Sequence, residues 1–538
     1  MSFIAIKNSF PMKKLFFALF ILRGPFFMTA QQTTIINFAE TINANDLRAH
    51  ETVLTSDSLE GRETGTSGNL KAAQYIALQF EKLGLPKVGK DKNYFQRMVY
   101  SNDGWNGIGF TINEHSYQHL FHFYALPYMN PIVKDLKIEA SEVVFMGYGI
   151  DDSRYSDYKN VDVKGKVIMI YADEPLKKDS ISLITKTKGK SDWSKDINKK
   201  LTTAYQKGVI AVLIIDAKTA ASIKEQRPFF NRSITGEVDL PDGKRPNNAF
   251  ISPDMAKEII GKNADAFAKA RKKCADGKPV SMVLPCELKI KMDKMFRQLI
   301  SQNVMGYIEG SDPVLKNELV IVSAHYDHLG KRGEQIYHGA DDNGSGTSSV
   351  LEIAQALSEA KKQGKGPRRS ILCLLMTGEE KGLLGSKYYV TFPVFPLEKT
   401  VADVNIDMVG RVDEKYEKLK NPNYIYVIGA DKLSQDLHDV NEKMNATYSK
   451  LTLDYTYNDE NDPNRYYYRS DHYNFAEKGI PAIFYFNGTH DDYHRPTDTI
   501  DKINFEKMAK IAQLAYFTVC EIANRDERLR ITKKTKTP

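Results

Sequence analysis

Short apolar runs alternate with helical patterns along the second half of the chain. The apolar runs occupy residues 318–324, 369–377, 402–407, 424–429 and 481–487. Near-continuous apolar runs of this length are typical of strands buried on both faces of a mostly parallel sheet. Residues 348–362 and 505–523 instead repeat apolar positions at the helical period, which predicts helices that cover the sheet. The pattern therefore predicts an α/β fold built on a mostly parallel mixed sheet.

The first half of the chain predicts two further parts. Residues 43–84 have the pattern of two helices around a polar loop at 58–68. From about 120 to 290 the pattern changes to short β-like runs with a helical stretch between them. These runs lie at 140–150, 165–175, 209–217 and 247–253, and the helical stretch lies at 195–208. We interpret this part as a smaller α/β domain inserted into the first.

Composition and charge exclude little except nucleic-acid binding. The chain is 42% hydrophobic and 27% charged, as in ordinary globular proteins. Residues 1–30 contribute four positive charges and no negative charge to the net charge of +7. The remainder is nearly balanced, and no basic stripe with interleaved aromatic residues is present. We therefore expect no nucleic-acid partner.

The N-terminus predicts export. Lys13 and Lys14 precede the apolar run at 15–22, and small residues at 29–30 resemble a cleavage site. The run is shorter than the ~20 residues that cross a bilayer, so no stable membrane span is expected after the signal is removed. A periplasmic or extracellular protein is predicted. Of four cysteines, Cys373 and Cys520 have the pattern of buried thiols, and a Cys274–Cys286 pairing stays open.

Potential metal ligands follow the apolar runs in order along the chain. They are His325, Asp342, Glu380, Asp407 and His494. Ligands of open α/β sheets bind beyond the carboxyl ends of the strands, so these side chains should meet in one crevice. Three carboxylates and two imidazoles suit a pair of divalent cations. This ligand set permits zinc, cobalt and manganese.

Each motif alone also has an ordinary structural explanation. Asp341 and Asp342 suit a helix N-terminus, and Glu379 and Glu380 suit a solvated helix start. Asp407 lies in apolar sequence and could form a buried salt bridge with Arg411. The order of all five candidates at predicted strand ends favours the metal site.

Four neighbouring residues suggest supporting roles. Asp327 and Asp498 each follow a histidine candidate and could orient its imidazole through the other ring nitrogen. His328 lies one residue past Asp327 and should face away from His325. Glu379 would stay free of metal and transfer protons, while Tyr493 could donate a hydrogen bond to a developing oxyanion.

At these residues the chain resembles the family M28 zinc peptidases of the bacterial secreted aminopeptidase type. The motifs are HYD (325–327), GADDNGSG (339–346), GEEKGLLGS (378–386), NIDMVG (405–410) and YHRPTDT (493–499). The resemblance implies that His325 and Asp407 hold one zinc ion and Glu380 and His494 a second, with Asp342 bridging. It also implies a cis peptide at Asp342–Asn343 and a substrate contact from Arg469.

The inserted part is similar to a protease-associated (PA) domain, for which contact with substrate, contact with a partner and a spacer role stay open. The predicted organisation is therefore residues 1–30 as signal peptide, 31–119 and 291–525 as peptidase domain, 120–290 as PA domain and 526–538 as basic tail. It implies a secreted two-zinc aminopeptidase acting on peptides. Carboxypeptidase or dipeptidase activity, a single-zinc glutaminyl cyclase and a non-catalytic ectodomain stay open beside it.

Overall fold

The computed structural model describes residues 36–177, 179–236 and 244–532. The predicted signal peptide and residues 533–538 of the predicted basic tail lie outside these residues. The chain divides into two compact units, one of residues 1–98 with 300–538 and the other of residues 99–299. The predicted insertion at 120–290 lies inside the second unit, and its identity as a PA domain stays a prediction. Among the described residues no helix is long and apolar enough to cross a membrane.

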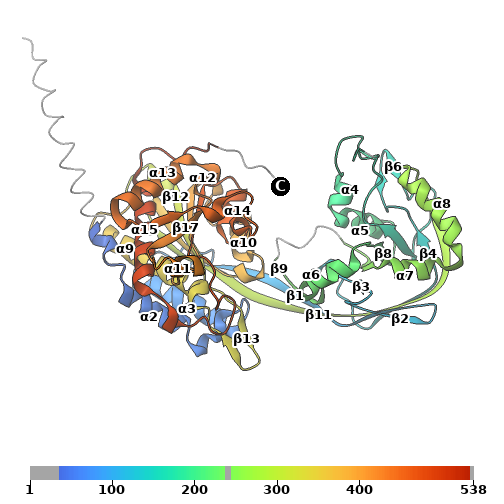
Figure 1. Cartoon of the computed structure of the whole chain (residues 1–538), viewed down its shortest axis with the longest axis horizontal. Coiled ribbons are helices and arrows are strands. Elements are labelled where there is room, and N and C mark those ends of the chain that lie inside the picture. Colours follow the sequence, from blue (N-terminus) through green and yellow to red (C-terminus); the bar gives the residue numbers. More distant parts are fainter. Residues whose placement is uncertain (1–35, 178, 237–243, 533–538) are drawn as a thin grey trace, which may run out of the picture. The chain divides into compact units, whose positions relative to one another are not determined.

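The first unit is built on a mixed, mostly parallel sheet, which confirms the predicted fold class (Figure 1). Its strand order is β18 (Thr452–Asp454), β17 (Tyr424–Ile428), β19 (Ala482–Phe486), β16 (Thr400–Ile406), β12 (Leu319–His325), β15 (Ser370–Met376) and β11 (Met282–Ile308). The four strands β19, β16, β12 and β15 are adjacent and parallel. Their carboxyl ends therefore lie along one edge of the sheet.

Helices cover both faces of this sheet. The main ones are α2 (Ala44–Leu54), α3 (Ser67–Lys82), α9 (Gly346–Lys362), α10 (Leu384–Thr391), α13 (Gln435–Met444), α14 (His472–Glu477) and α15 (Phe505–Asn524). Side chains of β12 alternate between two cores, since Val320 and Val322 pack with α3, α9 and α15, whereas Ile321 packs with α10 and α14. Both faces are buried, which is why the strand sequences are continuously apolar.

Shorter elements complete the first unit. They are β13 (Gly330–Arg332), β14 (Gln335–Tyr337), α11 (Glu414–Lys418) and α12 (Ala430–Leu433). The segments that leave the carboxyl ends of the parallel strands carry most of the polar residues singled out above.

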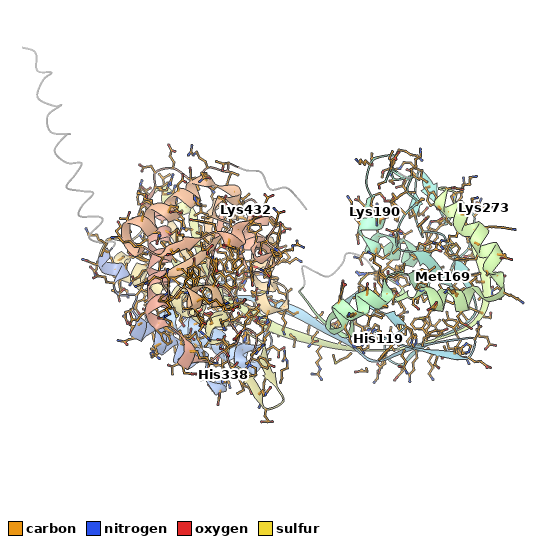
Figure 2. All side chains as sticks on the ribbon, in the orientation of Figure 1. His119, Met169, Lys190, Lys273, His338 and Lys432 are labelled. Atoms are coloured by element: carbon orange, nitrogen blue, oxygen red, sulfur yellow. The ribbon has the colours of Figure 1, made fainter. Side chains whose placement is uncertain are left out.

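The second unit has its own hydrophobic core, and its strands follow β11 in the hydrogen-bonded order. Strand order runs β11, β4 (Leu136–Phe145), β7 (Val167–Tyr171), β8 (Ala211–Ile215), β10 (Asn247–Ile251) and β3 (Phe123–Tyr124), while β1 (Phe95–Ile112) pairs with β11, β2 (His115–Gln118) and β9 (Arg232–Gly236). Its helices are α4 (Asp192–Lys195), α5 (Ile197–Gln206), α6 (Thr219–Asn231), α7 (Pro253–Ile260) and α8 (Ala264–Ala275). Met169 of β7 lies in the core of this unit (Figure 2). All four cysteines of the chain are buried free thiols, so Cys274 and Cys286 are not paired.

Candidate metal centre

Four adjacent parallel strands deliver the predicted ligands to one edge of the sheet. His325 is the last residue of β12, and Asp407 directly follows β16. Glu380 lies in the short turn after β15, and His494 lies in the loop after β19. The structure thus brings together side chains that are up to 169 residues apart in sequence, as the strand-end argument predicts.

Asp342 reaches the same edge from the turn before α9. This turn, Ala340–Ser345, packs tightly against the end of β16, and the Asn343 amide donates a hydrogen bond to the Ile406 carbonyl at 3.0 Å. A Cβ at Gly346 would lie 2.2 Å from that carbonyl oxygen, so only glycine fits there. The Asp342–Asn343 peptide is cis, as the resemblance implies.

The two carboxylate oxygens of Asp342 face different histidines. Its Oδ1 lies 3.5 Å from His325 Nε2, which is itself 3.3 Å from Asp407 Oδ1. Its Oδ2 lies 3.1 Å from His494 Nε2, which is 3.3 Å from Glu380 Oε2. Asp342 therefore stands between two groups of potential ligands.

These spacings fit small divalent cations. A tetrahedral ion with bonds of about 2.0–2.2 Å keeps its ligand atoms roughly 3.3–3.6 Å apart. In one group, atoms of His325, Asp342 and Asp407 all lie within 4.8 Å of one another. A second group of Asp342, Glu380 and His328 meets the same limit, so it includes a histidine that the sequence pattern does not predict as a ligand. Buried carboxylates this close together repel one another and favour cations.

Glu379 lies beside the first group without joining it. Its Oε2 is 3.9 Å from His325 Nε2, and its backbone N–H donates to Asp327 Oδ1 at 3.2 Å. Burial raises the pKa of Glu379 well above its usual range, and the nearby carboxylates of Glu380 and Asp407 raise it further. A carboxyl group so placed can exchange a proton with a neighbouring water.

The two predicted supporting acids have different positions. His325 Nδ1 lies 3.7 Å from the side-chain Oδ1 of Asp327 and 3.1 Å from its backbone carbonyl oxygen. Asp327 can therefore orient that imidazole. Asp498 instead accepts hydrogen bonds from the backbone N–H groups of Asp341 and Asp342 at 3.0–3.2 Å. Asp498 thus supports the turn that carries Asp342.

Asp407 and Arg411 do not form the salt bridge that the sequence leaves open. Arg411 lies 3.0 Å from Asp492 and 3.9 Å from Asp498. Asp407 accepts a hydrogen bond from Ser470 at 2.6 Å, and its other oxygen faces His325. The position of Asp407 is therefore that of a candidate ligand.

Tyr493 and Arg469 border a pocket next to the metal groups. Arg469 donates a hydrogen bond to the Tyr493 hydroxyl at 3.1 Å, and the Tyr493 ring stacks on His494. The pocket has a volume of about 330 Å³ including its open mouth. It is lined by Asp342, Glu379, Asp407, Met408, Tyr466, Arg469, Phe484, Phe486, Thr489 and Tyr493. Its lining combines three carboxylates with four aromatic rings.

Residues 303–519, which contain all these candidate ligands, match the model of peptidase family M28. This stretch, 217 of the 538 residues of the chain, is similar to the peptidases of that family. The match begins within strand β11 and ends within α15, so it covers the sheet of the first unit but not helices α2 and α3.

Curated proteins and one solved structure are also similar to this chain. Aminopeptidase YwaD of Bacillus subtilis is 29% identical over 266 residues, 48% of this chain and 52% of that protein. A probable leucine aminopeptidase of Arthroderma otae is 31% identical over 218 residues, 39% of this chain and 56% of that protein. The chain therefore spans about half the length of these relatives. An aminopeptidase from Aneurinibacillus sp. strain AM-1 shares the fold, with a TM-score of 0.51 at 19% identity, over 93% of this chain and 98% of that one.

A buried arginine that the sequence pattern does not single out holds the loops that carry His325 and Asp342. Arg62 donates hydrogen bonds to the carbonyls of Tyr326, His338 and Gly339, and to Leu54 in α2. His338 directly follows strand β14 (Figure 2). The only signal in the sequence is an arginine within a turn-rich stretch, because most of its partners are more than 260 residues away.

Replacing Arg62 with alanine is expected to destabilise the first unit by about 3 kcal/mol or more. The change leaves buried carbonyls unpaired and Glu51 without its nearby cation, and such losses are costly. Denaturant unfolding of the variant measures the effect. Arg48→Ala is the control, since Arg48 is exposed and stacks on Phe505, a contact worth ~1 kcal/mol or less. Equal stability of the two variants would contradict the role given to Arg62.

Proposed function

We propose that the protein is a two-zinc aminopeptidase that removes N-terminal residues from peptides. The observation that carries the proposal is the Asp342 carboxylate between two ligand groups, with Glu379 free beside it. His325 and Asp407 would hold one ion, and Glu380 and His494 the other. The names of the curated relatives support aminopeptidase action over carboxypeptidase, cyclase or pure binding roles.

The metal pair would supply the electrophilic part of the chemistry. When bound, the two ions would polarise the scissile carbonyl and lower the pKa of the attacking water toward neutrality. N and O donors of this kind also suit cobalt and manganese, so the ligand set accepts all three metals, and the proposal names zinc.

The side chains of the chain would carry the proton transfers. Glu379 would take a proton from the water as its oxygen attacks the peptide carbonyl carbon. The Tyr493 hydroxyl, positioned by Arg469, would donate a hydrogen bond to the oxygen that becomes negative. When the C–N bond breaks, Glu379 would pass the proton to the leaving amine, which returns the carboxylate to its starting state.

A metal count paired with a substrate screen tests this proposal. Two zinc equivalents and cleavage of aminoacyl-p-nitroanilides, with no cleavage of the N-acetylated forms, would support it. One equivalent with cyclisation of N-terminal glutamine would replace it with a cyclase. Cleavage at free C-termini would indicate a carboxypeptidase, and absence of metal and turnover would indicate a binding ectodomain.

The pocket predicts a preference for apolar side chains at the substrate N-terminus. Met408, Phe484 and Phe486 line it, and one methylene in such a pocket is worth ~1–3 kcal/mol. We expect kcat/KM for leucine p-nitroanilide to exceed that for alanine p-nitroanilide by at least ~10-fold. Phe484→Ala should reduce this ratio, whereas Phe392→Ala on the exposed surface should not. A preference for aspartate or glutamate substrates would contradict the prediction.

Export and the PA assignment are also proposals. Residues 1–30 would direct export and be removed. The measured mass of the purified secreted protein should therefore equal that of the chain without these residues. Residues 120–290 would form a PA domain that contacts substrate or a partner. Kinetics with peptides of increasing length test the substrate role, because a domain that restricts access should lower kcat/KM for long peptides.

A further inference from the structure

His328 is a buried histidine beside the Asp342–Glu380 group. Its side chain is fully buried, and its Nδ1 lies 2.8 Å from Glu380 Oε1 and 3.8 Å from Asp342 Oδ2. The ring packs against Gly339, where a Cβ would lie 2.5 Å from the imidazole. The close fit fixes the position of the ring next to two carboxylates.

The polar atoms of this contact have no hydrogen-bond partner. Among the described residues, neither ring nitrogen of His328 nor Oε1 of Glu380 makes a hydrogen bond of acceptable geometry, despite the short separation. An unpaired polar group in the interior costs ~1–3 kcal/mol. A cation bound by His328 Nδ1 and Glu380 Oε1 would give each of these two atoms a partner.

His494 approaches the same two carboxylates from another side. Its Nε2 lies 3.1 Å from Asp342 Oδ2 and 3.3 Å from Glu380 Oε2. The rings of His328 and His494 have centroids 5.9 Å apart and planes inclined by 68°. Both imidazoles therefore lie beside the same two carboxylates, and N and O donors of these kinds are ligands that divalent zinc accepts.

We propose that His328 Nδ1 is a further protein ligand of the ion held by Asp342, Glu380 and His494. The inference rests on the proposed two-metal function and adds a residue to it. The other ion would have only His325, Asp342 and Asp407, so the two sites would differ in protein ligands by one imidazole. A site with four protein ligands is closed and retentive, whereas one with three keeps an open position. The ion on the His328 side should therefore be the last to leave.

A crystal structure of the zinc-loaded protein tests the ligand directly. We expect a zinc–Nδ1 distance of about 2.0–2.1 Å at His328. After partial chelation, anomalous scattering should show the His325 side emptied first. An ion bound by Asp342, Glu380 and His494 with His328 Nδ1 beyond about 3 Å would overturn the inference and leave the proposed function intact. Failure to bind any zinc would instead overturn the proposed function itself.

Two substitutions separate ligation from a hydrogen bond. His328→Asn can still donate to Glu380 but ligates zinc poorly, and His328→Ala can do neither. We expect both to weaken binding of one zinc equivalent by a similar factor of more than ~100-fold, beyond the 10–100-fold typical of a residue that only orients a ligand. Competition with a chromophoric chelator measures this affinity. If asparagine restores wild-type affinity, His328 orients Glu380 and the inference is wrong.

A control variant guards against general effects of losing a histidine. His438→Asn removes a half-buried imidazole of α13 that contacts Tyr455. This variant should bind two equivalents with unchanged affinity. Circular dichroism of each variant checks folding before the metal titration.

Discussion

Replacing Glu379 with glutamine is expected to lower kcat by ~10²–10⁴-fold while metal content stays at the wild-type value. Glutamine has nearly the same shape as glutamate but cannot accept a proton from the attacking water. Glu379 approaches His325 only to 3.9 Å, and it belongs to neither ligand group, so its loss should leave the metals in place. Steady-state kinetics at matched zinc content measure the effect.

Glu414→Gln is the control for this substitution. Glu414 is exposed at the start of α11 and pairs with Lys418, so its replacement should leave kcat unchanged. A Glu379→Gln enzyme with near-normal kcat would remove Glu379 from the proton transfers. Reduced zinc content in that variant would place Glu379 among the ligands instead.

Asp342→Ala is expected to abolish binding of both metal ions together. Each of its oxygens faces a different histidine, so its removal takes one ligand from each site. Metal analysis after dialysis should find no bound zinc at concentrations that saturate the wild type. Thermal stability should then no longer respond to added zinc, because ligand binding stabilises only a folded state that binds it.

Asp407→Ala provides the matched comparison. Asp407 belongs to the His325 group alone, so this variant should keep one equivalent, on the side of Glu380 and His494. If Asp342→Ala also keeps one full equivalent, Asp342 does not bridge the ions.

The sheet and the ligand order are predictable because both are local properties of sequence. Apolar runs identify β12, β15 and β16 to within about two residues. His325, Glu380, Asp407 and His494 then follow from their places beyond strands, since parallel strands end at the same edge, whereas Asp342 comes from the turn before α9. The strand end that each of these ligands follows can be predicted without knowing the conformation of the loops between the strands.

Residues positioned by loops are not predictable in the same way. The pattern predicts that His328 faces away from His325, yet both imidazoles approach the Asp342 carboxylate, His325 at Oδ1 and His328 at Oδ2. Nothing in the sequence around His328 shows that Glu380 also lies beside it. The spacing of Asp498 predicts a contact with His494, whereas its hydrogen bonds go to a turn over 150 residues away. Such contacts depend on the path of long loops, which local pattern does not encode.

The division of the first unit into two stretches also constrains how the protein is made. Helices α2 and α3 emerge from the ribosome first, yet apolar residues such as Leu47, Ile76 and Phe80 pack against strands beyond residue 303. At ~5–20 residues per second, synthesis of the intervening 99–299 segment takes about 10–40 s. During that interval the strands against which these helices pack have not been synthesised. The first unit can therefore complete its folding only late in translation. Until then the apolar faces of α2 and α3 remain exposed and can aggregate.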